Sequence, residues 1–338
     1  MKIAFFSSKS YDRQFFELAN QDHQREMFFF DDALNADTAI LAQGFPVVCL
    51  FVNDHAPAPI LEKLASQGTQ LIALRCAGYN NIDLKKAAEL GLKVVHVPSY
   101  SPYAVAEHAV GLILALNRKL YRAYNRVRDD NFSLDGLLGF DLYGSMVGVI
   151  GTGKIGQCFA QIMQGFGCQV LGYDVFPSEA FTAIPQTRYV ALDELFSQSD
   201  IISLHCPLLP STHYLINAET IAQMKPGVML INTSRGHLID TQAVIDSIKS
   251  HHIGYLGIDV YEQEDELFFE DHSDTIIQDD TFQLLQSFPN VMITAHQGFF
   301  TRNALMAIAD TTLANIQEFE QGKTLRYEVH YQPKKAGN

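Results

Sequence analysis

The stretch MVGVIGTGKIG, residues 146–156, decides the fold of this chain. Its opening MVGVI is an apolar run that predicts a buried strand, and a helical pattern of apolar residues follows the last glycine. Gly151, Gly153 and Gly156 form a GxGxxG loop, and Asp174 follows Gly156 by 18 residues at the end of the next predicted strand. A strand, a glycine loop, a helix and an acidic residue at this spacing are typical of a dinucleotide-binding βαβ unit.

Each residue of this loop has a physical role in holding a dinucleotide. Gly151 permits the tight turn, Gly153 lets the backbone approach a pyrophosphate, and Gly156 allows the helix to pack closely. The helix N-terminus offers free N–H groups to the phosphates, and Asp174 can accept hydrogen bonds from ribose hydroxyls. Asp174 would repel a 2′-phosphate, and no Lys or Arg occurs between it and Arg188, so the sequence favours NAD over NADP. The alternative at this point is an ordinary glycine-rich turn.

The sequence lacks the motifs of several other chemistries. Residues 148–155, GVIGTGKI, nearly match a P-loop, but Ile155 stands where a Ser or Thr hydroxyl must bind magnesium. No HExxH or CxxC spacing indicates a metal site, and no GxSxG stretch indicates a serine nucleophile. We therefore expect neither a metal ion nor ATP hydrolysis.

Apolar runs alternate with amphipathic segments along the chain, which indicates parallel β-sheets covered by helices. A long helix is expected to open at Ser101-Pro102, to reach about Arg126 and to bridge two domains, and a final helix is expected near 302–320. About 145 residues precede the glycine loop, so the dinucleotide-binding domain is either inserted in the chain or C-terminal. Strands are expected at residues 2–7, 47–52, 70–74, 92–97, 146–150, 169–172, 200–205, 228–232, 255–258 and 291–294.

Composition limits the partners that this chain can have. A chain of 338 residues suits two domains, and 24 basic against 38 acidic residues give a net charge of −14. Such an acidic chain lacks the basic surface that nucleic acids and anionic membranes require. No apolar stretch suits a transmembrane helix, and the first residues indicate a strand rather than a signal peptide. The five cysteines are scattered, which is typical of a reducing compartment, so we expect a cytoplasmic protein.

Three chemically useful side chains follow three successive predicted strands. Arg235, Glu264 and His296 come after the strands expected at 228–232, 255–258 and 291–294. Because the carboxyl ends of parallel strands meet at one edge of a sheet, these side chains should lie beside the cofactor crevice. Hydride transfer to a 2-oxo acid requires such a set: a cation, a proton donor and a group that keeps the donor protonated. The alternative is a surface cation, a solvated acid and a packed histidine. His108, in the long helix, is interpreted as packed.

The chain resembles the D-2-hydroxyacid dehydrogenases over nearly its whole length. The glycine loop with Asp174 carries this resemblance together with the runs SLHCPLLPSTHYLI (203–216), MKPGVMLINTSRG (224–236), LGIDVYEQE (256–264) and TAHQGFFT (294–301). Three further runs resemble the bacterial fermentative D-lactate dehydrogenase branch of this family: LIALRCAGYNNIDL (71–84), VPSYSPYAVAEHAVGLILALNR (97–118) and FFEDHSDTIIQDD (268–280). The resemblance implies reversible, NADH-dependent reduction of pyruvate to D-lactate.

Carried over position by position, the resemblance implies roles for individual residues. Arg235 would hold the substrate carboxylate, His296 would donate the proton, and Glu264 would pair with His296 and favour its protonated form. The implied substrate-contacting positions are the backbone N–H groups around Ala77, Gly78 and Tyr79, the pocket-lining Tyr100 and Phe299, and Arg235 and His296 themselves. The implied NAD-contacting positions are Gly151, Gly153, Lys154, Ile155, Gly156, Asp174, Cys206, Pro207, Thr212, Thr233, Ser234, Arg235 and Asp259, where Thr212 replaces the Asn of some relatives.

The resemblance also implies an α/β architecture of two Rossmann-like or flavodoxin-like domains with parallel sheets. An NAD-binding domain at residues 100–298 would be inserted in a discontinuous substrate domain made of residues 1–99 and 299–338. The family forms dimers or tetramers, so a homodimer or homotetramer is expected. Two alternatives stay open: a dehydrogenase for a larger 2-oxo acid or hydroxypyruvate, and an NADH-sensing binding protein without turnover.

Overall fold

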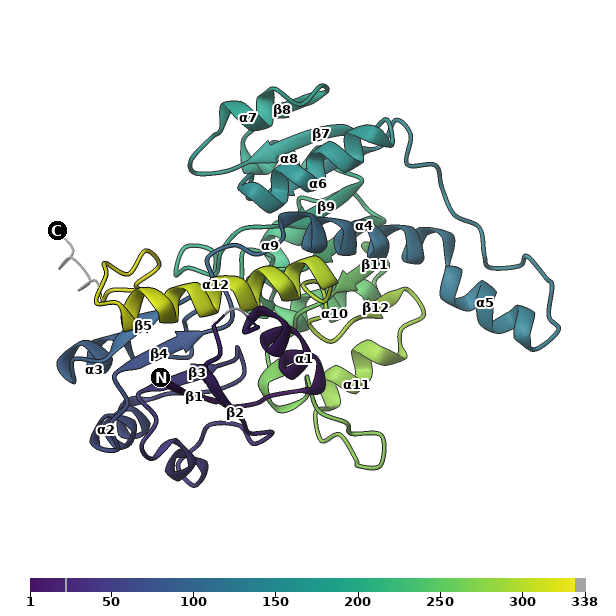
Figure 1. Ribbon diagram of the computed structural model, residues 1–338. Helices are drawn as coiled ribbons and strands as arrows, with labels where there is room; N and C mark the ends of the chain where they lie inside the picture. Colours follow the sequence, from purple (N-terminus) through teal and green to yellow (C-terminus); the bar gives the residue numbers. More distant parts are fainter. Residues whose placement is uncertain (22, 332–338) are drawn as a thin grey trace. The chain divides into compact units, whose positions relative to one another are not determined.

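The computed structural model describes residues 1–21 and 23–331, and these divide into two compact units (Figure 1). Unit 1 contains Met1–Ser101 and the chain from Phe300 onward, and unit 2 contains Pro102–Phe299. The chain therefore crosses from unit 1 to unit 2 and back once in each direction. Within the described residues, no helix is long and apolar enough to span a bilayer.

Unit 1 is built on a five-stranded parallel sheet with the order β2-β1-β3-β4-β5. The three central strands are almost completely buried apolar runs, which is typical of a parallel sheet covered on both faces. Helix α12 packs against α1 and β4 and thereby joins the last part of the chain to this sheet. The elements are β1 (Lys2–Phe5), α1 (Ser10–Ala19), β2 (Glu26–Phe29), β3 (Val47–Leu50), α2 (Ala58–Ser66), β4 (Leu71–Leu74), α3 (Leu84–Glu89), β5 (Lys93–Val95) and α12 (Arg302–Glu320), with a 3₁₀ turn at Thr38–Ala42.

Unit 2 is built on a seven-stranded parallel sheet with the order β12-β11-β10-β9-β6-β7-β8. Its strands are β6 (Met146–Ile150), β7 (Gln169–Tyr173), β8 (Thr187–Tyr189), β9 (Ile201–Leu204), β10 (Val228–Asn232), β11 (Ile253–Ile258) and β12 (Val291–Ile293). Its helices are α4 (Pro102–Arg118), α5 (Leu120–Arg128), α6 (Lys154–Gly165), α7 (Glu179–Thr182), α8 (Leu192–Gln198), α9 (Ala218–Ile221), α10 (Thr241–Lys249) and α11 (Asp280–Ser287), with 3₁₀ turns at Gly236–Leu238 and Glu264–Glu266.

The order of strands in unit 2 reverses at β6. The chain runs outward from β6 to β7 and β8, then returns to β9 on the other side of β6. A crevice at the carboxyl ends of the strands is expected at such a reversal, and ligands of open α/β sheets bind there. The glycine loop leaves β6 at this position. The predicted α/β class with two parallel sheets is confirmed.

Three features differ from the sequence-based expectations. The edge strands β2 and β8 were not predicted, because both are short and partly exposed and therefore lack the apolar run of a central strand. The long helix expected from Ser101-Pro102 to about Arg126 opens at Pro102 but is interrupted. Lys119 has a φ of +48°, a left-handed conformation that a continuous helix cannot contain, so α4 and α5 are separate helices.

Candidate active site

The glycine loop after β6 is packed so closely that two of its glycines have no room for a side chain. Gly151 has a φ of +95°, and a Cβ added to it would lie 2.5 Å from the backbone nitrogen of Cys206. A Cβ on Gly156 would overlap the backbone oxygen of Gly151. A Cβ on Gly153 would meet no described atom within 4 Å, so the middle glycine leaves open space at the start of α6.

The residues around this loop fit NAD. Helix α6 begins after Gly153 without a side-chain cap or a first-turn acid among the described residues, so its N–H groups suit a pyrophosphate. The half-buried Asp174 accepts hydrogen bonds from the backbone nitrogens of Thr152 at 2.7 Å and Phe176 at 2.9 Å, which leaves acceptor sites for ribose hydroxyls. The Thr233 hydroxyl is buried without a partner in the described part of the chain, as expected of a group that awaits a ligand.

The loop after β9 contributes structural groups to the same edge. Burial raises the pKa of the Cys206 thiol to about 11, so it stays protonated at neutral pH. Burial lowers the pKa of His205 to about 3, so its imidazole is neutral. The Thr212 hydroxyl donates to the Pro207 carbonyl at 2.7 Å and accepts from the Leu209 nitrogen at 2.8 Å. Thr212 therefore closes a turn of this loop.

His296 and Glu264 form a hydrogen-bonded pair. Nδ1 of His296 lies 2.8 Å from Oε1 of Glu264, and both side chains are largely buried. The second carboxylate oxygen of Glu264 accepts from the backbone nitrogen of Tyr261 at 2.9 Å, which fixes the carboxylate in place. Because Nδ1 is engaged with Glu264, Nε2 is the nitrogen of His296 that can exchange a proton with a ligand.

Arg235 follows β10 in a loop that lies against the segment carrying Glu264. The Asn232 side chain accepts from the Ser234 nitrogen at 3.0 Å and donates to the Arg235 carbonyl at 2.8 Å. A Cβ on Gly236 would overlap the backbone of Tyr261, so the two loops are in direct backbone contact. The structure therefore places Arg235, Glu264 and His296 in three adjoining loops at the carboxyl edge of β10, β11 and β12.

Asp259, at the end of β11, is the buried centre of this edge. Its Oδ1 accepts from the Thr294 hydroxyl at 2.6 Å and from the Gln297 nitrogen at 2.8 Å, and its Oδ2 accepts from the Gly298 nitrogen at 2.8 Å. Burial alone would raise the pKa of Asp259, but the hydrogen bonds from His108 and Thr294 and the nearby histidine charges outweigh burial and lower it. Asp259 is therefore an anion that holds the turn after β12.

The remaining predicted substrate residues are divided between the units. Ala77, Gly78 and Tyr79 follow β4 in unit 1, where the Ala77 carbonyl lies 2.9 Å from Nδ1 of His96 and the Tyr79 ring meets the His96 ring edge-on at 5.4 Å. Tyr100 is half-buried near the end of the first segment of unit 1, and Phe299 is the nearly buried last residue of unit 2.

Sequence reasoning missed several residues that hold this edge together. Asn232 and Thr294 stand at strand ends, so the same positional signal that selected Arg235 could have found them. Gly236 is required by a backbone contact that no local pattern reveals. His108 was interpreted as a packed helix residue, yet its Nε2 lies 2.9 Å from the Thr294 hydroxyl.

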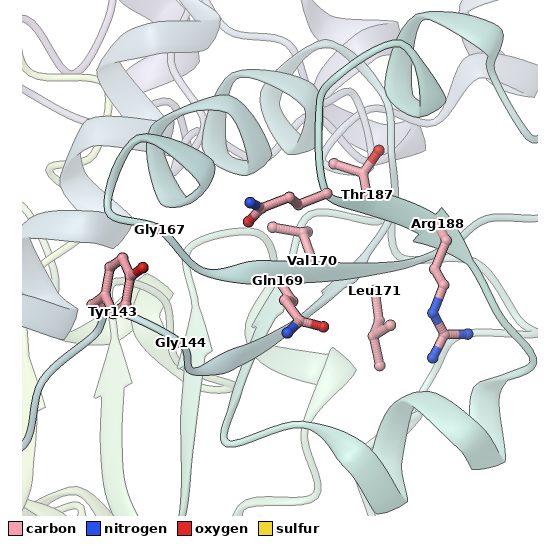
Figure 2. A pocket seen from close by; sticks show the side chains of 9 residues that line it. Tyr143, Gly144, Gly167, Gln169, Val170, Leu171, Thr187 and Arg188 are labelled. Atoms are coloured by element: carbon pink, nitrogen blue, oxygen red, sulfur yellow. The ribbon is translucent and has the colours of Figure 1, made fainter.

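A separate depression lies at the opposite end of the unit 2 strands. It has a volume of about 560 Å³ and is lined by the starts of β7 and β8 and by Tyr143 and Gly144, which precede β6 (Figure 2). Tyr143 stands at one side and Arg188 at the other. Because it adjoins the amino ends of the strands, it does not belong to the edge that carries Asp174, Arg235 and His296.

Comparison with known proteins identifies the family. Residues 110–298 match the model of the D-isomer specific 2-hydroxyacid dehydrogenase, NAD binding domain, which confirms the predicted cofactor. The chain is 54% identical to a 2-hydroxyacid dehydrogenase homolog of Haemophilus influenzae, over 96% of this chain and 97% of that protein. It is 52% identical to the D-lactate dehydrogenase of Escherichia coli, over 97% of this chain and 100% of that protein. The solved structure of the pyruvate reductase of Chlamydomonas reinhardtii superposes with a TM-score of 0.92 at 48% identity, covering 96% of this chain and 98% of that one. This chain therefore belongs to the D-isomer specific 2-hydroxyacid dehydrogenase family.

Proposed function

We propose that this protein is a D-lactate dehydrogenase that reduces pyruvate to D-lactate with NADH and catalyses the reverse oxidation. The observation that carries the proposal is the His296–Glu264 pair, held at 2.8 Å next to the loop of Arg235. This set supplies the proton donor, its anionic partner and the cation that reduction of a 2-oxo acid requires. The similarity to proteins named D-lactate dehydrogenase and pyruvate reductase supports pyruvate as the substrate.

The cofactor would be held by the edge that surrounds β6. The N-terminus of α6 would bind the pyrophosphate, Asp174 would bind the adenosine ribose, and Thr233 would supply a hydroxyl. Lys154, Ile155, Pro207 and Thr212 border this edge through the loops described above. When bound, NADH supplies the hydride that is added to C2 of pyruvate.

The protein's own residues would manage charge and protons. Arg235 would pair with the substrate carboxylate, together with backbone N–H groups around Ala77 and Gly78. His296 would give the proton on Nε2 to the oxygen of C2, which turns the developing alkoxide into the hydroxyl of D-lactate, and would take it back in the oxidation. Glu264 would stabilise the imidazolium through Nδ1 and prevent rotation of the ring.

Two rivals to pyruvate reduction predict different behaviour. Tyr100 and Phe299 would line a pocket for a methyl group, and a wider pocket would favour a larger 2-oxo acid or hydroxypyruvate. An NADH sensor would bind the cofactor without turnover. The complete set of Arg235, Glu264 and His296 favours turnover over sensing.

Self-association is the second part of the proposal. Helix α5 has no buried residue in the described structure, and Leu120, Tyr124 and Val127 are each more than half exposed on it. Phe132, Leu134 and Leu138, in the segment that follows α5, are 71–87% exposed. Soluble proteins rarely leave such a surface uncovered, so we assign it to the contact of a homodimer or homotetramer.

The cysteines support our proposal for the compartment. None of the five cysteines forms a disulfide bond in the described residues, and four are buried. Cysteines without disulfide bonds are typical of a reducing environment, which supports a cytoplasmic location.

The deciding experiment measures NADH oxidation with pyruvate, hydroxypyruvate and larger 2-oxo acids, and resolves the product by enantiomer. We expect fast turnover with pyruvate and D-lactate as the product. The variant His296→Ala should reduce turnover by about 10²–10⁴-fold, whereas His330→Ala, which removes a 71% exposed imidazole, should leave it unchanged. Turnover only with larger acids, or NADH binding without turnover, would establish one of the rivals instead.

A further inference from the structure

His108 takes part in a continuous chain of hydrogen bonds that ends at the backbone of the turn carrying His296. It lies on α4, and its Nε2 is 2.9 Å from the Thr294 hydroxyl and 3.3 Å from Oδ1 of Asp259. The Thr294 hydroxyl in turn lies 2.6 Å from the same Asp259 oxygen. The His108 side chain is 20% exposed and that of Asp259 is 2% exposed, so the chain is shielded from water.

The direction of these hydrogen bonds is determined by their acceptor. An ionised carboxylate can only accept, so the Thr294 hydroxyl must donate its single proton to Asp259. The Thr294 oxygen can then only accept from His108, which requires a proton on Nε2 of His108. The Nε2–H of His108 therefore donates to Thr294 at 2.9 Å, with Oδ1 of Asp259 at 3.3 Å as a second and longer acceptor, and loss of this donor removes an orienting partner from both.

The network holds the turn that carries His296. Asp259 accepts from the backbone nitrogens of Gln297 and Gly298, and its own carbonyl accepts from the His296 nitrogen at 2.7 Å. His296 has a φ of +50°, which is unfavourable for a residue with a side chain and persists only where the surroundings impose it. The imidazole is therefore directed toward Glu264 by a strained backbone that Asp259 restrains.

We propose that His108 is a positioning residue for His296, acting through Thr294 and Asp259. The proposal rests on the proposed function in so far as His296 is the proton donor. His108 donates from Nε2 to Thr294, which fixes the Asp259 carboxylate so that both of its oxygens face the backbone of the turn. Loss of this donor loosens the turn and spreads His296 over several orientations, which slows the proton-transfer step without weakening cofactor binding.

The test compares two substitutions of the same residue in the full-length protein. His108→Leu introduces an apolar side chain of similar size and removes the donor, whereas His108→Gln keeps an N–H donor near the position of Nε2. We expect His108→Leu to lower kcat by about tenfold to hundredfold and to leave the dissociation constant of NADH unchanged. His108→Gln should recover most of that loss. Glu107→Gln, an exposed neighbour on α4, is the control for substitution in this helix.

A double-mutant cycle tests the route through Thr294. Thr294→Val removes the hydroxyl that links His108 to Asp259. If both residues act in one chain, the double variant His108→Leu/Thr294→Val should be no slower than the slower single variant. Multiplication of the two single effects would overturn the route.

Amide hydrogen exchange provides a readout that does not need activity. In the protein without cofactor, the Gln297 and Gly298 amides should exchange about threefold to tenfold faster in His108→Leu than in wild type, and His108→Gln should restore their protection. Unchanged exchange in His108→Leu, or equal effects of Leu and Gln on both exchange and kcat, would overturn the proposal. If wild type does not reduce 2-oxo acids, the proposed function fails, and the exchange rates alone still decide whether His108 positions the turn.

Discussion

Both parallel sheets carry a buried polar network at their carboxyl edge, but the two networks have opposite polarity. In unit 1 the central group is a cation, Arg75, which donates to Asp12 at 3.2 Å and to the Phe6 and Ser7 carbonyls at 2.9 and 2.8 Å. In unit 2 the central group is an anion, Asp259, which accepts from two backbone nitrogens and a hydroxyl. Arg75 and Asp259 are both almost completely buried.

The partners of each network show what it stabilises. Arg75 joins the ends of β1 and β4 to α1, and its guanidinium lies 4.8 Å from the centre of the Phe51 ring, just after β3. Burial alone would lower the pKa of Arg75, but Asp12 and the other anionic groups around it outweigh burial and raise it. Arg75 therefore stays charged, and its network stabilises the sheet of unit 1.

Asp259 instead gathers donors from a single turn and from one helix. Its carboxylate accepts from the backbone of Gln297 and Gly298, and its carbonyl accepts from the backbone of His296, so these hydrogen bonds hold the turn that carries His296. A buried charge that links strands should matter mainly for folding, and a buried charge that orients a turn should matter mainly for turnover. Substitutions at Arg75 and Gly298 test this distinction.

The largest effect is expected from Arg75→Leu. It leaves Asp12 as an uncompensated buried charge and should lower the free energy of unfolding by about 3–5 kcal/mol, measured by denaturant titration. The control is Arg188→Leu, which breaks a 2.7 Å ion pair with Glu194 at the surface and should cost less than about 1 kcal/mol. Similar losses in the two variants would show that the Arg75 network does not stabilise the fold.

Gly298→Ala probes the second network. The added Cβ would lie 2.9 Å from Oδ2 of Asp259, and this carboxylate cannot move without breaking the hydrogen bonds that hold it. We expect kcat for pyruvate to fall by about tenfold to hundredfold, with a loss of about 1–3 kcal/mol in the free energy of unfolding.

Gly165→Ala is the matched control for Gly298→Ala. Its Cβ at the end of α6 would meet no described atom within 4 Å, so both turnover and stability should stay close to wild type. If Gly298→Ala lowered the free energy of unfolding as much as Arg75→Leu does and left kcat unchanged, the Asp259 network would serve folding rather than turnover. The distinction between the two networks would then be wrong.

The sequence predicted the parts of the site that depend on local pattern. Gly151, Gly156 and Asp174 occur at a spacing that the chemistry of dinucleotide binding requires, and the loop has the close contacts that this spacing implies. Glu264 and His296 were selected because they follow predicted strands, and the structure joins them by a hydrogen bond. Position at the carboxyl end of a buried strand is therefore an informative signal.

Other parts depend on contacts between distant segments, which no local pattern contains. His108 lies 186 residues before Thr294, and its helical spacing indicates only a face of α4. Arg75 lies in the run LIALRCAGYNNIDL (71–84), which carries part of the family resemblance, but nothing in that run shows that its guanidinium is buried against Asp12. The edge strands β2 and β8 are too short and too exposed to be distinguished from loops.

The smallest effect concerns His205, a buried group outside both networks. Its Nε2 lies 2.9 Å from the Ser203 hydroxyl, and burial lowers its pKa to about 3. The unfolded chain binds a proton at His205 below about pH 6.5, whereas the folded chain does not until about pH 3, so stability must fall as the pH falls through this range.

His205→Gln should remove this part of the pH dependence and can keep the hydrogen bond to Ser203. Between pH 6.5 and 5.5, wild type should lose about 1 kcal/mol more of its free energy of unfolding than the variant does. Denaturant titrations of the protein without cofactor at the two pH values measure this difference, and His330→Gln should behave like wild type. Equal losses in wild type and in His205→Gln between the two pH values would show that this pH dependence does not arise from His205.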